Sequence, residues 1–330
     1  MSSLQEQDRI TLAAESTAGW SRKDLLDTDT LTAGEIELIM QTADAMAEVR
    51  SRPVAKVPTL RGSVIVTLFY EQSTRTRASF EVAGKSLGAD VINVSASGSS
   101  VEKGESLVDT IRTLEAIGAD LLVMRHRSSG APYLAAKQTK ACVINGGDGT
   151  HAHPTQALLD LYTMRRHLGE VAGRKVAIIG DVLHSRVARS NAWLLLAAGA
   201  SVTLCGPATL LPRSLEPHAT ALDRLEVTTD IRQAMSDADV VMALRIQKER
   251  QTAGLIPSLR DYVNGYQITQ DRLDAARPGA MVMHPGPINE GIELAPDVAH
   301  GSVSVIEEQV ANGVTVRMAL LYLMVAGAGQ

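Results

Sequence analysis

The stretch SVIVTLFYEQSTRTRASF occupies residues 63–80. Its apolar beginning, Val64 to Tyr70, has the length and β-branched content of a buried strand, and the polar residues after it predict the start of a helix. A helix start presents unpaired backbone N–H groups and a partial positive charge, to which the hydroxyls and the arginine of Ser73–Thr76 add further donors. The stretch therefore predicts a strand-to-helix turn that binds an anion.

Strand-like and helical patterns alternate on both sides of this turn. A capping-box pattern at Thr32 and Glu35, followed by apolar residues at helical spacing, predicts a first helix over residues 32–52. After the turn come three more β-rich runs, separated by helical patterns: ADVINVS at 89–95, ADLLVMRH at 119–126 and ACVING at 141–146. This alternation predicts a parallel β-sheet with helices on both faces.

The same alternation occurs a second time after residue 153. Its strand-like runs are RKVAIIGD at 174–181, ASVTLCGP at 200–207, LEVTTD at 225–230, VVMALR at 240–245 and AMVMHPG at 280–286. We therefore expect an α/β protein of two similar domains, residues 1–152 and 153–302, each a parallel β-sheet flanked by helices. The long amphipathic segment 303–330 is expected to form a C-terminal helix that packs back on the first domain.

The composition is that of an ordinary globular protein. Of its 330 residues, 45% are hydrophobic and 21% charged, and with a net charge of -5 no basic face for nucleic acid or a membrane surface is expected. Cys142 and Cys205 lie far apart in apolar runs and are expected to be buried thiols in a reducing compartment. We find no signal-peptide pattern and no run of roughly 18 apolar residues, and expect a cytoplasmic protein.

Polar residues at the predicted strand ends are mostly basic. In open α/β sheets the functional residues gather at the carboxyl ends of the strands. The basic residues in these places are Arg75, Lys103, Arg125, His126, His153, His184, Arg186, Arg245, Lys248, Arg250 and His284. Such a local concentration of positive charge in an acidic protein predicts a small polyanionic substrate rather than a macromolecule.

Each motif also has a purely structural explanation. The STRTR stretch could only cap a helix, Lys103 could be a solvated surface lysine, and RIQKER at 245–250 could be a solvated charge run. His151 and His153 could bind zinc, but no third ligand with usable spacing stands nearby. The G-x-G-x-x-G and G-x-x-x-x-G-K-[ST] patterns are absent, so neither a metal nor a nucleotide cofactor is expected.

Taken together, these motifs resemble the aspartate and ornithine carbamoyltransferase family. The resemblance rests on STRTR at 73–77 and HPTQ at 153–156, and it extends from about Trp20 to the C-terminal helix. It implies one domain for carbamoyl phosphate, one for the acceptor amino acid, and no metal or covalent enzyme intermediate. SVEKGESLVDT, ALRIQKER and MHPGP are similar to the aspartate branch, whereas the D-x-x-x-S-M-G and H-C-L-P segments of ornithine enzymes do not occur.

The resemblance implies a role for each group of candidate residues. For carbamoyl phosphate, it implies that the phosphate is held by Ser73, Thr74, Arg75 and Thr76, and that the carbonyl oxygen faces Thr76, Arg125 and His153. By the same resemblance, the carbamoyl amide is held by Gln156 and the backbone carbonyls of Gly286 and Pro287. It also implies that L-aspartate is bound by Lys103, Arg186, Arg245 and Gln247. The expected catalytic residues are Arg75, Thr76, Lys103, Arg125 and His153. The implied reaction gives N-carbamoyl-L-aspartate and phosphate, an early step of pyrimidine synthesis.

The resemblance further implies a homotrimer with shared active sites, in which the loop of Ser99 and Lys103 reaches the neighbouring subunit's site. Regulatory chains or a dihydroorotase as additional partners stay open. Glu290 stands where many relatives have an arginine, and it is expected to weaken anion binding unless a cation such as Arg317 offsets its charge. Two alternatives remain: a related transcarbamylase with another acceptor amine, against which RIQKER speaks, and a catalytically weakened subunit or scaffold.

Overall fold

The computed structural model describes residues 19–95, 105–212, 222–247, 255 and 258–327. It contains two compact units, one comprising the chain up to Gly149 together with the residues from Gly313 on, and the other Thr150–Asn312. The sequence analysis placed the domain boundaries after residues 152 and 302. The second boundary instead lies inside the C-terminal helix, α12 (Ile306–Gly327), because that helix contributes its first two turns to the second unit.

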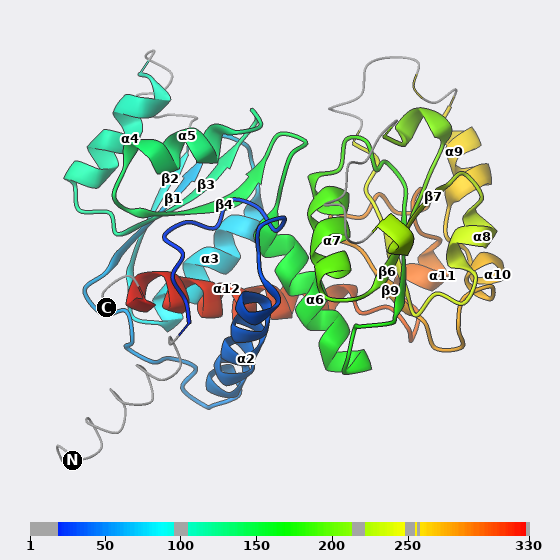
Figure 1. Ribbon diagram of the computed structural model, residues 1–330, viewed down its shortest axis with the longest axis horizontal. Coiled ribbons are helices and arrows are strands. Elements are labelled where there is room, and N and C mark those ends of the chain that lie inside the picture. The colour runs from blue at the N-terminus through cyan, green and yellow to red at the C-terminus, as the bar shows by residue number, and fades with distance from the viewer. Residues whose placement is uncertain (1–18, 96–104, 213–221, 248–254, 256–257, 328–330) are drawn as a thin grey trace. The chain divides into compact units, whose positions relative to one another are not determined.

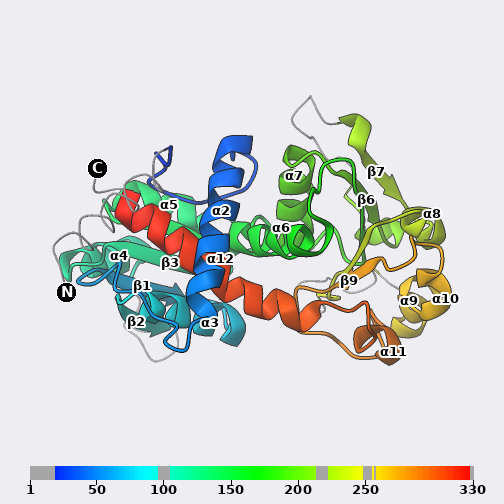
Figure 2. The same ribbon diagram turned by 90° about the horizontal axis from the view of Figure 1, so that it is seen from below.

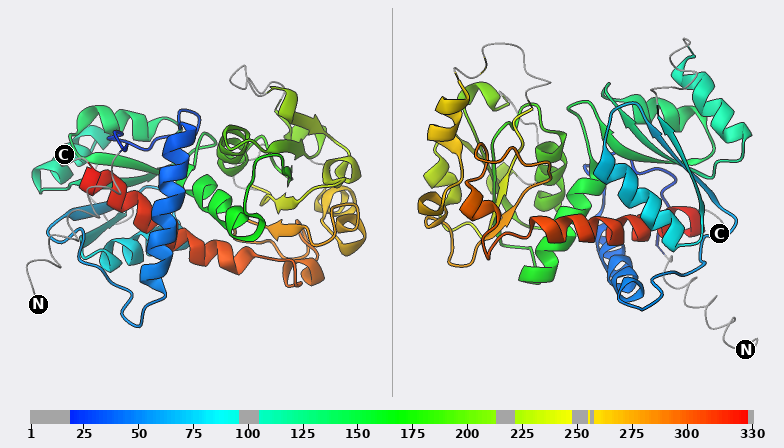
Figure 3. Two further views of the ribbon diagram at one scale, coloured as in Figure 1. Left: turned by 60° about the horizontal axis from the view of Figure 1, so that its bottom comes forward. Right: turned by 180° about the vertical axis from the view of Figure 1, so that it is seen from behind.

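The first unit is built on a four-stranded parallel sheet in the order β2-β1-β3-β4 (Figure 1). Its strands are β1 Val64–Phe69, β2 Asp90–Ser95, β3 Leu121–His126 and β4 Cys142–Asp148. Its other helices are α2 Ala33–Arg50, α3 Thr74–Ser86, α4 Leu107–Ala116 and α5 Ala131–Gln138. Helices α4 and α5 cover one face, and α3 and α12 cover the other (Figure 3). The predicted parallel sheet, with a C-terminal helix packed back on it, is confirmed.

Three strands of this sheet, β1, β3 and β4, are buried almost throughout. Both faces of β1 and β3 are covered by helices, which accounts for the apolar runs at 64–69 and 121–124. Basic side chains appear at the end of β3, where Arg125 and His126 are half-buried. The apolar core therefore supports a polar edge at the carboxyl ends of the strands.

The second unit is built on a five-stranded parallel sheet in the order β7-β6-β5-β8-β9. Its strands are β5 Lys175–Ile179, β6 Ser201–Cys205, β7 Leu225–Thr228, β8 Val240–Ala243 and β9 Met281–Met283. Its helices are α6 Pro154–Leu168, α7 Arg186–Ala197, α8 Ile231–Met235, α9 Leu259–Tyr266, α10 Gln270–Leu273 and α11 Pro296–Ala299, with short 3₁₀ segments at Ala208–Leu210 and Leu222–Arg224. Helices α6 and α7 lie on one face, opposite α8 and α10 (Figure 2).

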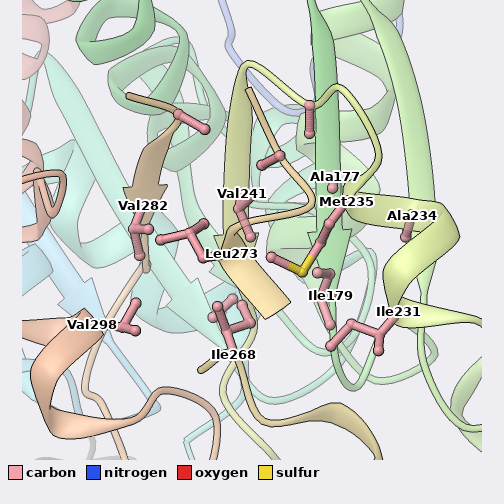
Figure 4. Close-up of a cluster of buried hydrophobic side chains, with 14 of the residues drawn as sticks. Ala177, Ile179, Ile231, Ala234, Met235, Val241, Ile268, Leu273, Val282 and Val298 are labelled. Atoms are coloured by element: carbon pink, nitrogen blue, oxygen red, sulfur yellow. The ribbon is translucent and has the colours of Figure 1, made fainter. Parts of the chain in front are cut away.

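An apolar cluster fixes the second sheet to its helices (Figure 4). Ile179 of β5, Val241 of β8 and Val282 of β9 extend from the sheet and pack against Met235 of α8 and Leu273 of α10. Full burial of one such side chain contributes roughly 1.5–3 kcal/mol. The cluster gives the loops that follow β5, β8 and β9 a rigid base.

Helix α12 is, among the described residues, the one helix long and apolar enough to cross a membrane by composition. Its sequence contains no uninterrupted run of roughly 18 apolar residues, as expected, but its mean hydropathy is high. However, 67% of the apolar stretch is buried inside the protein, where Met318, Leu320 and Leu323 are fully enclosed. A helix that is apolar on all sides is also what the core of a large domain requires, so burial accounts for its composition.

The two cysteines are buried free thiols, as predicted. Burial raises the pKa of Cys142 to about 11 and that of Cys205 to about 12. Both thiols therefore stay protonated near neutral pH and are poor nucleophiles.

Helix α2 begins with the predicted capping box. Thr32 Oγ1 accepts a hydrogen bond from Glu35 N at 3.2 Å, and Glu35 Oε2 accepts one from Thr32 N at 2.8 Å. Arg22 forms an ion pair with the same carboxylate. Burial acts to raise the pKa of Glu35, but the hydrogen bonds from Arg22 and Thr32 outweigh it and lower the pKa to about 2.

We expect Glu35→Gln to lower the free energy of unfolding at neutral pH by about 1–2 kcal/mol, because glutamine loses the ion pair and the charged cap. Since the folded-state pKa is depressed, the stabilisation is present above the unfolded pKa, about 4.5, and is lost as the pH falls through about 2. Urea unfolding at pH 7 and at about pH 3 checks this, with the exposed Glu48→Gln as control. An equal loss at both pH values contradicts the assignment.

Candidate active site

The predicted anion-binding turn lies at the start of helix α3. Ser73 is the N-cap residue, and its hydroxyl accepts a hydrogen bond from Thr76 N at 3.4 Å. Arg75 is exposed in the first helical turn, whereas Thr76 is buried. The stretch therefore does cap a helix, and the same geometry directs the positive end of the helix toward the position that an anion would take.

Arg125 is brought beside this turn by the sheet register. Strands β1 and β3 are parallel neighbours with Phe69 opposite Arg125, and Tyr70 N donates to Arg125 O at 2.8 Å. The guanidinium Nη2 lies 2.6 Å from Glu71 Oε1, and Nη1 donates to Gly146 O at 3.4 Å. Arg125 is thus held next to the turn that follows β1. Sequence analysis did not single out Glu71, although it lies in the quoted stretch.

The aromatic rings of Tyr70 and His126 pack against each other. Their rings are 4.8 Å apart, and burial lowers the pKa of His126 and raises that of Tyr70. His126 is therefore mainly neutral at pH 7 and adds no charge to the anion-binding turn.

His153 and Gln156 lie at the start of α6 in the second unit. His153 is the N-cap residue, is buried, and donates its backbone N–H to Ser190 Oγ at 2.9 Å. Gln156 lies in the first turn and donates from Nε2 to Asp160 Oδ1 at 3.0 Å. Within the described residues, no group of three or more His, Cys, Asp and Glu residues could hold a metal.

Gly286 and Pro287 lie in the loop after β9. His284 N donates to Gln309 Oε1 at 2.9 Å, and Gly286 N donates to His284 Nδ1 at 2.8 Å. Gly286 has φ of 66°, a left-handed conformation that favours glycine. The loop is therefore folded tightly around His284.

Three of the four predicted acceptor-binding residues, Arg186, Arg245 and Gln247, lie at neighbouring strand ends of the second sheet. Arg186 is the first residue of α7 after β5 and is buried, and Arg245 follows β8, the strand beside β5. Gln247 N donates to Asp181 Oδ2 at 3.3 Å, and Asp181 Oδ1 lies 2.7 Å from His184 Nδ1. The loops after β5 and β8 are thus tied together by a buried carboxylate.

Glu293 ties the loop after β9 to the loop after β8 in the same way. Its side chain is buried and accepts from Ile246 N at 2.9 Å and from Asn289 N at 2.9 Å. Neither Asp181 nor Glu293 could be predicted from the sequence, because an acidic residue in a loop gives no sign of the neighbouring loop that it will hold.

The remaining predicted features concern Glu290 and residues that lie outside the structure. Glu290 is exposed, and its Oε1 lies 3.6 Å from His300 Nε2. The guanidinium of Arg317 lies 5.1 Å from the ring centre of Phe80. The suggested Arg317 partner stays a prediction. The structure does not describe Ser99, Lys103, Lys248 and Arg250.

Comparison with known proteins identifies what the chain is similar to. Residues 23–166 match the family model "Aspartate/ornithine carbamoyltransferase, carbamoyl-P binding domain", and residues 172–324 match "Aspartate/ornithine carbamoyltransferase, Asp/Orn binding domain". The aspartate carbamoyltransferase catalytic subunit of Roseiflexus sp. is 60% identical over 301 residues, 91% of this chain and 94% of that protein. The catalytic subunit from Dehalococcoides mccartyi is 55% identical over 316 residues, 96% of this chain and 95% of that protein.

Solved structures give a similar result. Aspartate transcarbamoylase from Trypanosoma cruzi in complex with carbamoyl phosphate and aspartate has a TM-score of 0.84 and 32% identity, covering 93% of this chain and 98% of that one. Ornithine carbamoyltransferase from Pyrococcus furiosus has a TM-score of 0.82 and 30% identity, covering 92% of this chain and 97% of that one.

Proposed function

The chain belongs to the aspartate/ornithine carbamoyltransferase family, and we propose that its own residues perform the aspartate reaction of that family. It transfers the carbamoyl group of carbamoyl phosphate to the α-amine of L-aspartate, giving N-carbamoyl-L-aspartate and phosphate. The observation that carries the choice of aspartate is the 60% identity to an aspartate carbamoyltransferase catalytic subunit over 91% of the chain. The product would enter pyrimidine synthesis.

The turn at the start of α3 binds the phosphate group in this proposal. Ser73, Thr74, Arg75 and Thr76 supply hydroxyl, guanidinium and backbone donors, and the helix N-terminus adds its partial positive charge. Arg125 stands beside the turn because Glu71 and the sheet register hold it there. Its guanidinium can therefore reach the carbamoyl oxygen of a substrate whose phosphate is bound at the turn.

Transfer begins when the neutral amine of aspartate attacks the carbamoyl carbon. Negative charge then grows on the carbonyl oxygen, where Thr76, Arg125 and His153 supply donors. Gln156 Oε1 and the carbonyl oxygens of Gly286 and Pro287 accept hydrogen bonds from the carbamoyl NH₂ group. The C–O bond to phosphate breaks as the C–N bond forms, and the departing phosphate accepts the amine proton. Holding two small reactants in line can supply roughly 7–11 kcal/mol of the barrier reduction.

The acceptor site suits two carboxylates better than an ammonium group. Arg186, Arg245 and Lys103, with the amide of Gln247, provide cationic and neutral donors. The acidic residues nearby, Asp181 and Glu293, already accept hydrogen bonds from the loop backbone. They are therefore poorly placed to bind the side-chain ammonium of ornithine.

A product assay tests the proposal. The purified chain is supplied with carbamoyl phosphate and either L-aspartate or L-ornithine, and phosphate release is followed together with the carbamoylated amino acid. Turnover with aspartate alone is expected. Carbamoylation of ornithine, or no product from either acid although carbamoyl phosphate binds, contradicts the proposed acceptor.

Glu290→Arg is expected to lower the KM for aspartate by about two- to fivefold, a small effect because Glu290 is exposed and its charge is screened. Glu290 follows Asn289, and Glu293 links Asn289 to the loop of Arg245 and Gln247. A positive charge there favours a dicarboxylate substrate. Steady-state kinetics at low and high salt check this, with His300→Ala as control for loss of the contact with His300 alone. An unchanged or higher KM counts against any cost from Glu290.

We also propose a cytoplasmic homotrimer whose sites combine residues of two subunits, with Lys103 supplied by the neighbour. Lys103→Ala and Arg75→Ala subunits, each inactive alone, are unfolded, mixed in equal amounts and refolded. Random reassembly should restore both residues at about a quarter of the sites. The refolded mixture is expected to approach that fraction of the wild-type activity. Mixed trimers without activity contradict the shared site.

A further inference from the structure

We infer that Asp160 is a positioning residue that makes Gln156 present its amide oxygen, and not its NH₂ group, to the carbamoyl group. The inference rests on the proposed function, in which Gln156 holds the carbamoyl amide. Asp160 does not touch substrate in this account. It acts through Gln156 and, by a second route, through the loop after β9.

Asp160 is a fully buried carboxylate in the middle of α6 that accepts from three side-chain amides. Oδ1 accepts from Gln156 Nε2 at 3.0 Å and from Gln309 Nε2 at 2.9 Å, and Oδ2 accepts from Asn191 Nδ2 at 2.8 Å. The three amides come from three helices, α6, α12 and α7. An ionised carboxylate can only accept hydrogen bonds, so each amide must turn its NH₂ group toward Asp160.

For Gln156 this constraint decides which end of its amide group faces the substrate. With Nε2 committed to Asp160, Oε1 is directed away from the carboxylate, and no described residue donates a hydrogen bond to it. An amide oxygen is an acceptor only, and the NH₂ group of carbamoyl phosphate is a donor. The buried charge of Asp160 therefore selects for an NH₂ group on the substrate.

The second route runs through Gln309. Its Nε2 donates to Asp160 Oδ1, and its Oε1 accepts from His284 N at 2.9 Å. A flip of the Gln309 amide would break both hydrogen bonds, so its orientation is fixed. His284 Nδ1 in turn accepts from Gly286 N at 2.8 Å. One carboxylate oxygen thus orients both groups proposed to bind the carbamoyl amide, Gln156 and the carbonyl groups at Gly286 and Pro287.

A purely structural role explains less. Burying a carboxylate is costly compared with an apolar or amide side chain of similar size, so packing alone does not favour an aspartate here. Asn191 shows how strongly the carboxylate acts on its neighbours. Its NH₂ group donates to Asp160 and to Val187 O, while its buried Oδ1 has no hydrogen-bond partner among the described residues.

Asp160→Asn tests the inference because asparagine keeps the size and replaces one acceptor by a donor. Gln156 is then free to turn its NH₂ group toward the substrate, where it meets the carbamoyl NH₂ donor to donor. The KM for carbamoyl phosphate should rise about 10- to 100-fold. Acetyl phosphate, which carries a methyl group in place of the NH₂, serves as a competitive probe. Its inhibition constant should change less than about threefold, because no hydrogen bond to a methyl group is lost.

Two further variants separate positioning from loss of structure. Asp239→Asn is the matched control, since Asp239 is also a buried carboxylate, accepts from Arg174 and Arg277, and contacts no proposed site residue. It should leave the preference for carbamoyl over acetyl phosphate unchanged. In the double variant Asp160→Asn/Gln156→Glu, one carboxylate oxygen at position 156 accepts from the new amide NH₂ group at position 160. The other carboxylate oxygen faces the substrate as a hydrogen-bond acceptor. Its preference for carbamoyl phosphate over acetyl phosphate should be at least about tenfold higher than that of Asp160→Asn.

Equal weakening of carbamoyl phosphate and acetyl phosphate in Asp160→Asn overturns the inference. If Asp160→Asn does not fold, the double variant decides: a folded double variant that prefers carbamoyl phosphate supports the inference, and one without that preference overturns it. Failure of the proposed function is distinguished by the wild type, which would then make no N-carbamoyl-L-aspartate at all.

Discussion

Arg75→Ala should lower kcat/KM for carbamoyl phosphate by about 10²- to 10³-fold. Arg75 is exposed in the first turn of α3, where a guanidinium can bind a phosphate through two charge-assisted hydrogen bonds, each contributing about 1.5–3 kcal/mol. Alanine keeps the helix, because the Ser73 cap does not involve the Arg75 side chain. The loss should therefore arise in substrate binding and not in folding.

Arg77→Ala is the matched control for Arg75→Ala. It removes the same charge from the same helix two residues further on, and it should retain most of the activity. Initial rates over a range of carbamoyl phosphate concentrations, with inorganic phosphate as a competing anion, make the comparison. Similar losses in the two variants would show that only the net charge of the helix matters and not the position of Arg75.

Arg125→Ala should lower kcat by about 10²- to 10³-fold, the usual effect of removing one donor to a developing oxyanion. In the structure Arg125 lies beside the proposed phosphate-binding turn, held by Glu71 Oε1 at 2.6 Å and by Gly146 O at 3.4 Å. Arg125→Lys should recover only part of the rate, because an ammonium keeps the charge but lacks the planar fork.

The exposed Arg127 provides the control, since it has the same chemistry two residues further along. Arg127→Ala should leave kcat close to the wild-type value, and Glu71→Gln should lower it less than Arg125→Ala does. Rates at saturating concentrations of both substrates separate kcat from binding. An Arg125→Ala enzyme with unchanged kcat and a raised KM would assign Arg125 to ground-state binding alone.

Features that depend on neighbours in the chain could be predicted well. The capping box of Thr32 and Glu35 and the start of α3 after Ser73 involve residues within one helical turn, so their spacing is visible in the sequence. The parallel sheets followed from apolar runs separated by helical patterns. The boundary inside α12 could not be predicted, because a continuous helical pattern does not show which of its turns pack against which unit.

The sequence by itself determined the two-sheet α/β fold, the strand-to-helix turn at residues 73–76 and, through the paired STRTR and HPTQ motifs, the family. Only the tertiary structure decided which carboxylates contact the candidate site residues and their loops: Glu71 binds Arg125, Asp160 binds Gln156, and Asp181 and Glu293 accept from Gln247 N and Ile246 N. The reason is physical. A hydrogen bond between residues far apart in the chain depends on strand order and register, and these depend on how every helix packs on its sheet.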